Sequence, residues 1–335
     1  MGRQVLRCDV IDALPPPTRV AVVGAGNVGA TFAYALLLSG LAAEIVLVDA
    51  NHARAEGEAM DLNHAVPFTR PARIWAGTFG DCAGAALTVL TAGAAQRPGE
   101  SRLDLLTRNA EIFGQIVPQV ARHNPDGILL VATNPVDVLT YAAWRLSELP
   151  ARRVIGSGTI LDTARFRYLL SQYYRVDPRS VHAFIAGEHG DSEVPIWSLA
   201  NIAGMRLPVF CAQQGIPYDQ AAMDELFLRT RDAAYHIIER KGATYYAVAT
   251  GLLRIVEAIL RDQNTVLSVS SLIGGFKDID FEGIEDVCLS LPTIVNRSGV
   301  EQVLRLDLSP SEAASLRASA RIISTTLDSL GLHRG

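Results

Sequence analysis

Short apolar runs alternate with longer amphipathic segments in the first half of the chain. The alternation predicts strands at 18–24, 44–50, 86–93 and 127–134, and helices at 27–40, 56–66, 103–123 and 135–146. Strands that alternate with helices pair in parallel through right-handed crossovers. We therefore expect an α/β fold with a doubly wound, parallel sheet.

The pattern changes near residue 150. A helix is expected near 160–174, followed by short β-like pieces, two long helices between about 219 and 261, further strands, and a final helix at about 309–330. We expect two domains: a first at 18–156 and an α+β domain at 157–332 lying against it. Residues 1–17 are expected to form a flexible arm.

Composition narrows the class of protein. The 335 residues are 49% hydrophobic and 19% charged, with a net charge of −5, which is typical of a globular protein without a basic surface for nucleic acid or anionic lipid. No apolar run reaches the roughly 18 residues of a membrane span. The four cysteines are far apart and form no cluster with histidines, so we expect no metal site and a reducing, cytoplasmic location.

The segment GAGNVG supplies Gly24, Gly26 and Gly29 between a strand and a helix, and Asp49 follows twenty residues later at the end of the next strand. Glycines in such a turn also occur for structural reasons alone, but this context is that of a dinucleotide site, in which the helix N-terminus stabilises a pyrophosphate. Asp49 would accept hydrogen bonds from ribose hydroxyls and repel a 2′-phosphate, which favours NAD over NADP. Arg54 is either a solvated helix charge or a contact to the adenosine side.

Four further segments are informative when taken together: AQRPGESR at 95–102, TNPVD at 133–137, LDTARFR at 161–167 and GEHGDSE at 187–193. Together with the glycine motif they resemble the lactate and malate dehydrogenase family, most closely its bacterial L-lactate dehydrogenases, from Thr18 to the final helix. The resemblance implies a Rossmann domain that binds NAD, followed by a catalytic domain. It also implies reversible hydride transfer between NADH and pyruvate, giving L-lactate and NAD⁺.

The resemblance assigns roles to two residues that would otherwise be a turn histidine and a helix N-cap. His189 resembles the family's acid–base histidine, and Asp162 resembles the partner that orients the ring. A carboxylate beside the ring stabilises the imidazolium and raises the pKa of the histidine above about 6.5.

The other implied site residues surround this pair. Arg165 would hold the substrate carboxylate by two parallel hydrogen bonds. Arg102, in a polar loop, would close over the substrate and polarise its carbonyl. The resemblance places Asn134 and Thr244 at the substrate, and it adds the following residues to the cofactor site: Val28, Gly93, Ala94, Thr133, Asn134 and Ser157.

Gln96 lies six residues before Arg102, where malate enzymes of the family carry an arginine. A second substrate carboxylate would need a cation there, because an unpaired buried charge is costly. Gln96 therefore favours pyruvate over oxaloacetate. A one-residue shift of the loop would instead place Arg97 at the pocket, so a malate dehydrogenase is the alternative.

Arg167 and His182 resemble the site at which fructose 1,6-bisphosphate activates many bacterial lactate dehydrogenases, and the family suggests a homotetramer. The alternative for these two residues is a salt-bridged surface arginine and a strand histidine. Two rival functions are a non-catalytic NAD-binding protein, which would lack part of the set His189, Asp162, Arg165 and Arg102, and an NAD-dependent glycosidase, which would need metal ligands.

Overall fold

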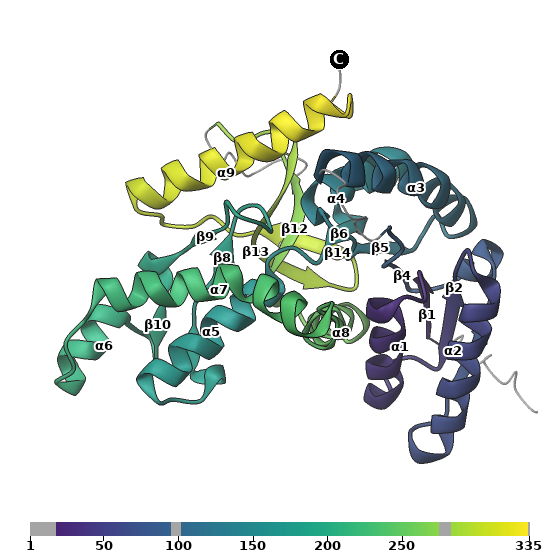
Figure 1. The fold of residues 1–335 in the computed structure, drawn as a ribbon, viewed down its shortest axis with the longest axis horizontal. Coiled ribbons are helices and arrows are strands. Elements are labelled where there is room, and N and C mark those ends of the chain that lie inside the picture. The colour runs from purple at the N-terminus through teal and green to yellow at the C-terminus, as the bar shows by residue number, and fades with distance from the viewer. Residues whose placement is uncertain (1–17, 95–101, 275–282, 334–335) are drawn as a thin grey trace, which may run out of the picture.

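A nine-stranded sheet forms the centre of the computed structural model, which describes residues 18–94, 102–274 and 283–333 (Figure 1). Six of its strands are parallel, in the order β3-β2-β1-β4-β5-β6. Their bounds are β1 Arg19–Val23, β2 Glu44–Val48, β3 Arg73–Ala76, β4 Leu87–Leu90, β5 Ile128–Val131 and β6 Val154–Gly156. Apart from the edge strand β3, these strands are buried almost throughout, as expected for a parallel sheet covered on both faces. The predicted doubly wound fold is confirmed.

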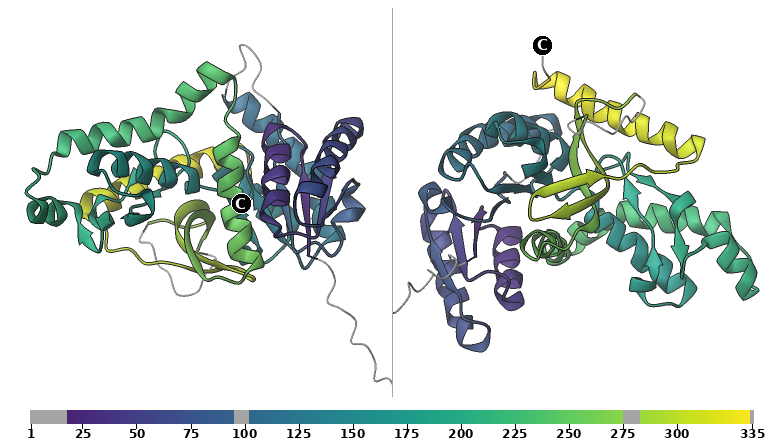
Figure 2. Two further views of the ribbon diagram at one scale, coloured as in Figure 1. Left: turned by 90° about the horizontal axis from the view of Figure 1, so that it is seen from below. Right: turned by 180° about the vertical axis from the view of Figure 1, so that it is seen from behind.

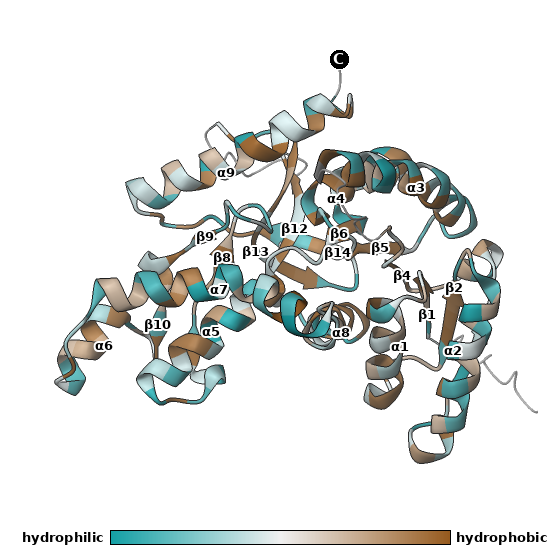
Figure 3. Ribbon diagram, in the orientation of Figure 1, coloured by the Kyte–Doolittle hydropathy of each residue, from teal (hydrophilic) through white to brown (hydrophobic). Residues whose placement is uncertain are grey.

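Four helices connect these strands: α1 Asn27–Ser39, α2 His52–Ala65, α3 Arg102–His123 and α4 Val136–Ser147. Helices α3 and α4 pack against each other (Figure 1). Helix α2 begins four residues before its expected start, because the side chain of Asn51 accepts the backbone N–H of Arg54 and caps it. Figure 3 shows hydrophobic strands at the centre and a more hydrophilic α2 at the edge of the molecule.

The sheet continues past the parallel strands into the second half of the chain. Strands β12 Thr265–Ile273, β13 Val287–Asn296 and β14 Gly299–Val303 are antiparallel, and β12 joins β6 at the pair Ser270 and Gly156. One sheet therefore runs across the expected boundary at residue 156, and the domain limits stay a prediction.

The rest of the second half forms a smaller layer beside this sheet. Its helices are α5 Ile160–Tyr174, α6 Leu207–Gln214, α7 Gln220–Lys241, α8 Tyr246–Leu260 and α9 Pro310–Ser329. Its short strands are β7 Val181–His182, β8 Ile185–Ala186, β9 Val194–Pro195, β10 Asn201–Ile202 and β11 Met205–Arg206. Short 3-10 turns occupy Val66–Phe68, Phe79–Cys82, Ala151–Arg153, Pro178–Ser180 and Trp197–Leu199. Helix α7 lies along α5 (Figure 2).

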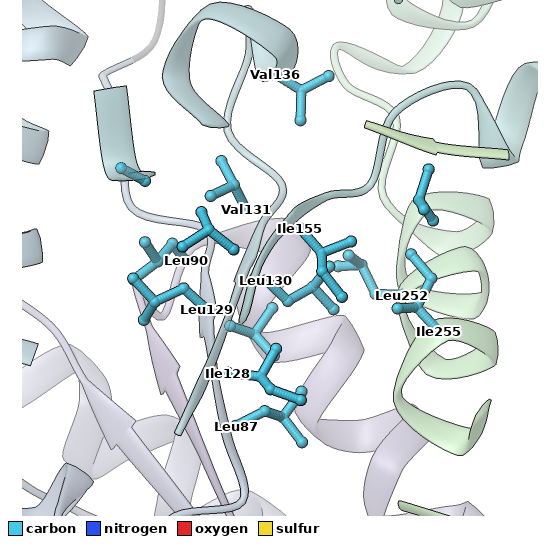
Figure 4. Packing of buried hydrophobic residues seen from close by; sticks show 14 of the residues in the cluster. Leu87, Leu90, Ile128, Leu129, Leu130, Val131, Val136, Ile155, Leu252 and Ile255 are labelled. Carbon is cyan, nitrogen blue, oxygen red and sulfur yellow. The ribbon is translucent and has the colours of Figure 1, made fainter. Parts of the chain in front are cut away.

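Helix α8 joins the two halves of the molecule. It packs against α1, and its Leu252 and Ile255 face Ile155 and Leu130 of the parallel sheet in one core (Figure 4). A second core around Phe166 and Leu170 of α5 lies in the smaller layer. Helix α8 also contacts α5 and β13, so it connects the smaller layer to the central sheet. Within the described residues, no helix is both long and apolar enough to cross a membrane.

Candidate active site

The three motif glycines meet different surroundings. Gly24 follows β1 with φ of 105°, and a Cβ there would lie 2.4 Å from the backbone nitrogen of Ala92. A Cβ on Gly29 would lie 1.9 Å from the carbonyl oxygen of Gly24. A Cβ on Gly26 would meet no protein atom within 4 Å, although Gly26 is the N-cap of α1. Gly24 and Gly29 are thus required for packing, whereas Gly26 keeps open the space in front of the helix N-terminus.

Asp49 closes this loop against the end of β2. Its carboxylate accepts the backbone N–H of Ala25 at 2.6 Å and that of Asn51 at 2.8 Å. The sequence indicated only contacts to ribose hydroxyls, and the structure adds a second task, which is to hold the glycine loop and the start of α2 in place. A carboxylate can accept about four hydrogen bonds, so Asp49 has capacity for a ligand as well.

A cavity of about 510 Å³ opens beside the glycine loop. Six residues expected at the cofactor line it: Gly24, Gly26, Asp49, Arg54, Gly93 and Ala94. Phe79, Ile112 and Ile116 supply apolar walls. An open helix N-terminus, an acid at the next strand and a partly apolar cavity fit a dinucleotide, with its pyrophosphate at α1 and its adenosine near Asp49.

The other expected cofactor residues lie outside the lining of this cavity. Val28 packs against the core, and the Thr133 hydroxyl donates to the carbonyl of Ala92 at 2.8 Å. Asn134 is exposed beyond β5, and Ser157 donates its backbone N–H to Val131 at 2.7 Å. Thr133, Asn134 and Ser157 follow the carboxyl ends of β5 and β6, where ligands of open α/β sheets bind.

Asn109 was not indicated by the sequence, yet it connects two of these loops. Its side chain is 1% exposed, accepts the backbone N–H of Ala94 at 2.8 Å and donates to the carbonyl of Asn134 at 3.1 Å. The only sequence signal is an amide on the apolar face of α3. Asn109 therefore positions Ala94 and Asn134 relative to each other.

His189 and Asp162 form the pair that the sequence predicted. The ring Nδ1 lies 2.5 Å from a carboxylate oxygen of Asp162, across 27 residues of sequence. Burial alone would lower the pKa of His189, but the attraction of Asp162 raises it to about 9. Burial would raise the pKa of Asp162, and the attraction of His189 lowers it instead. The pair therefore favours imidazolium beside carboxylate, with Nε2 as the ring nitrogen not engaged by Asp162.

Arg165 lies on the same side of α5 as Asp162. Its guanidinium donates to the other oxygen of Asp162 at 2.9 Å, and its side chain is 14% exposed. Residues three apart on a helix are neighbours, which places the guanidinium next to the histidine. The group offers five donors, so the contact leaves capacity for an anion.

Asp137 holds the backbone of His189. This carboxylate, 2% exposed in the first turn of α4, accepts the N–H of His189 at 2.7 Å and the Ser290 hydroxyl at 3.3 Å. Burial raises the pKa of Asp137 to about 6, although the hydrogen bond from the backbone of His189 opposes the rise. The sequence assigned a role only to Asn134 of the motif TNPVD. Nothing in it indicated the contact of Asp137 with His189.

Three expected substrate residues are less well defined. Thr244 lies partly buried in the connection between α7 and α8. Gln96 lies outside the described residues, and Arg102 is described only as the first residue of α3. The roles of Gln96, Arg102 and Thr244 stay predictions.

The two expected effector residues lie close together, away from Asp162. Arg167 donates from Nε to the carbonyl of Ala183 at 2.8 Å, and its guanidinium lies 5.0 Å from the centre of the Phe184 ring. His182, exposed on β7, directly precedes Ala183. Arg165 and Arg167 thus face different surroundings.

Comparisons with known proteins agree with this geometry. The NAD-binding domain model of lactate/malate dehydrogenases matches residues 18–156, and the model of their alpha/beta C-terminal domain matches residues 159–330. The L-lactate dehydrogenase of Priestia megaterium is 52% identical over 94% of this chain and 97% of its own, and that of Acetivibrio thermocellus is 51% identical over 94% and 98%.

Solved structures give the same result. The ligand-bound crystal structure of the minor L-lactate dehydrogenase from Enterococcus mundtii superposes with a TM-score of 0.89 at 42% identity, over 93% of this chain and 98% of that one. A lactate dehydrogenase from a deep-sea metagenome library superposes with a TM-score of 0.88 at 45% identity, over 94% and 99%. The chain belongs to the lactate/malate dehydrogenase family, whose members are NAD-dependent oxidoreductases.

Proposed function

We propose that this protein is an L-lactate dehydrogenase that interconverts pyruvate and L-lactate. The main support for this proposal is the contact of His189 with Asp162, which also binds Arg165. The chain is in addition about half identical to L-lactate dehydrogenases. A proton donor next to an anion-binding guanidinium suits a 2-keto acid, which carries both a carbonyl and a carboxylate.

The proposed reaction assigns one task to each residue. Bound NADH supplies a hydride to the carbonyl carbon. His189 gives the proton on Nε2 to the carbonyl oxygen, so that the C=O double bond becomes an alcohol and the ring becomes neutral. Asp162 keeps the ring oriented and stabilises the imidazolium before transfer. Arg165 binds the carboxylate, and Arg102 polarises the carbonyl while covering the substrate. Lactate oxidation follows the same steps in reverse.

Asn134 and Thr244 complete the proposed substrate site, and Gln96 sets its selectivity. A neutral amide at position 96 suits the methyl group of pyruvate and leaves the second carboxylate of oxaloacetate unpaired. The relatives and solved structures reported above are lactate dehydrogenases, which does not favour the malate alternative.

NADH oxidation by the purified protein with pyruvate and, separately, with oxaloacetate tests this proposal. We expect a large preference for pyruvate and a shift toward oxaloacetate in Gln96→Arg. A preference of the unmodified protein for oxaloacetate would show that a cation, most directly Arg97, faces the substrate.

We further propose that Arg167 and His182 bind fructose 1,6-bisphosphate in a homotetramer. Arg167 binds the carbonyl of Ala183, the residue after His182, which supports a single polyanion site. A bisphosphate that bridges two such sites on neighbouring subunits would stabilise one arrangement of the subunits. Exposed apolar side chains also suit an interface, since Phe68 is 89% exposed and Met60 is 61% exposed.

The pyruvate saturation curve, with and without the bisphosphate, at neutral and mildly acidic pH, tests the effector site. We expect a lower KM with the bisphosphate and no response in Arg167→Gln. An unchanged curve in the unmodified protein contradicts the site, and light scattering that gives a mass other than four chains contradicts the tetramer.

We propose a cytoplasmic location, which the free thiols of Cys82, Cys211 and Cys288 support. Fractionation of the cells that produce the protein tests it. Recovery with periplasmic or secreted proteins would contradict it.

A further inference from the structure

Glu193 is a buried acid beside the catalytic pair that the proposed reaction does not use. It ends the segment GEHGDSE, where its backbone N–H donates to the carbonyl of Gly190 at 3.2 Å. This turn brings the residue back into the molecule before β9, and Glu193 is only 7% exposed. One carboxyl oxygen is fully enclosed and has no hydrogen-bond partner among the described residues.

Four charged groups act electrostatically on Glu193: Asp162 and Arg165 from α5, His189 from its own turn, and Arg231 from α7. Both guanidiniums already have an acidic partner. Arg165 donates to Asp162 at 2.9 Å, and Arg231 donates to Asp232 at 2.9 Å. Glu193 therefore lacks a cation of its own, whereas Asp162 adds a negative charge close by.

A buried carboxylate with a bare oxygen and a neighbouring carboxylate is strongly disfavoured, and such a group takes up a proton instead. Burial, followed by the repulsion of Asp162, raises the pKa of Glu193 to about 9. Once ionised at higher pH, Glu193 would join Asp162 and Asp137 in stabilising the imidazolium of His189.

We propose that Glu193 is a positioning residue for His189: an enclosed acid of the same turn, with an unpartnered carboxyl oxygen, whose charge acts together with that of Asp162 to keep the ring protonated. While uncharged, it leaves the positive charge of His189 and Arg165 available to a substrate carboxylate. The importance of His189 for turnover rests on the proposed function, but the electrostatic link between the two side chains does not.

The link is tested by the NMR titration of ¹³C-labelled histidine in the full-length protein without substrate, with the His189 signal assigned through His189→Asn. In Glu193→Gln, a neutral side chain of the same size, we expect the midpoint of His189 to fall by about half a pH unit or more. The titration should also become simpler in shape, because one coupled group is gone.

Glu239→Gln is the matched control, because Glu239 is an exposed acid on α7. It should leave the His189 titration unchanged. If Glu193→Gln fails to fold, Glu193→Met removes the same charge in an apolar site and serves for the same titration. Superimposable His189 titrations of the unmodified protein and the Glu193 variant would overturn the inference. Absence of pyruvate reduction in the unmodified protein would contradict the proposed function alone.

Discussion

The carboxylate of Asp137 accepts the backbone N–H of His189 at 2.7 Å across 52 residues of sequence. Because Asp137 lies in α4, directly after the loop that carries Asn134, the contact joins the NAD-binding half to the turn that carries the proposed proton donor. Asp162 orients the ring while Asp137 fixes the main chain, so two buried acids from different helices determine where Nε2 lies.

Asp137→Asn should reveal how much the burial of this charge lowers the free energy of unfolding. Burial raises the pKa of Asp137 from 3.8 to about 6, so stability contributed by the protonated group is fully present below 3.8 and lost as pH rises through about 6. Asparagine does not ionise. Between about pH 4.5 and 7.5 the variant should therefore gain stability relative to the unmodified protein, by about 2 kcal/mol.

Urea unfolding at the two pH values measures this difference, and Asp61→Asn, at an exposed position of α2, is the control. If the stability difference between the two proteins did not change with pH, ionisation of Asp137 in the folded protein would carry no such free-energy cost. The same variant should lower turnover, because a neutral acceptor holds the His189 turn less firmly.

Asp162→Asn should move the pH profile of pyruvate reduction to lower pH. The attraction of Asp162 sustains the pKa of His189 at about 9, against burial, so the protonated donor persists to alkaline pH in the unmodified protein. Without that charge, the alkaline fall of pyruvate kcat/KM should move toward about pH 6.5 or below. At pH 7 a midpoint of about 6.5 leaves roughly a quarter of the histidine protonated, so the loss should be about fourfold or more.

Lactate oxidation provides an internal control for Asp162→Asn, because it uses neutral His189 and should lose less at alkaline pH. Equal losses in both directions at every pH would point to a damaged site rather than a shifted histidine.

Gly26→Ala and Gly29→Ala separate cofactor binding from folding. Gly26 has an extended backbone with φ of −73° and open space around a Cβ, so Gly26→Ala should fold normally. It should bind NADH about tenfold more weakly or worse, because the methyl group occupies the expected pyrophosphate space. A Cβ on Gly29 would clash with the carbonyl of Gly24, so this variant should lose about 1–3 kcal/mol of stability.

NADH fluorescence titration and thermal unfolding distinguish the two variants. Unchanged NADH affinity in Gly26→Ala would place the pyrophosphate elsewhere.

The sequence predicted the parallel strands because each is a short apolar run followed by an amphipathic helix. It did not predict β3 or α6: β3 contains only four residues, RIWA, and α6 only eight, LPVFCAQQ. Patterns of such length do not distinguish helix from strand. The junction of β6 with β12 was also missed, because antiparallel pairing across more than 100 residues leaves no local signal.

At the site, resemblance brought His189 and Asp162 together, and the structure confirmed that they touch. Asn109, Asp137 and Glu193 were missed for a common reason. Each supports a backbone segment or a charge rather than a substrate, and in the sequence each is an ordinary polar residue whose burial becomes visible only in three dimensions.

The proposed function requires His189 to supply the proton for reduction of pyruvate by NADH. His189→Asn tests it, with NADH binding measured by fluorescence and pyruvate reduction measured in the same preparation. We expect NADH affinity to stay within about threefold while turnover falls by about 10²–10⁴-fold, the range of general acid catalysis. Turnover retained at the level of the unmodified protein would contradict the claim.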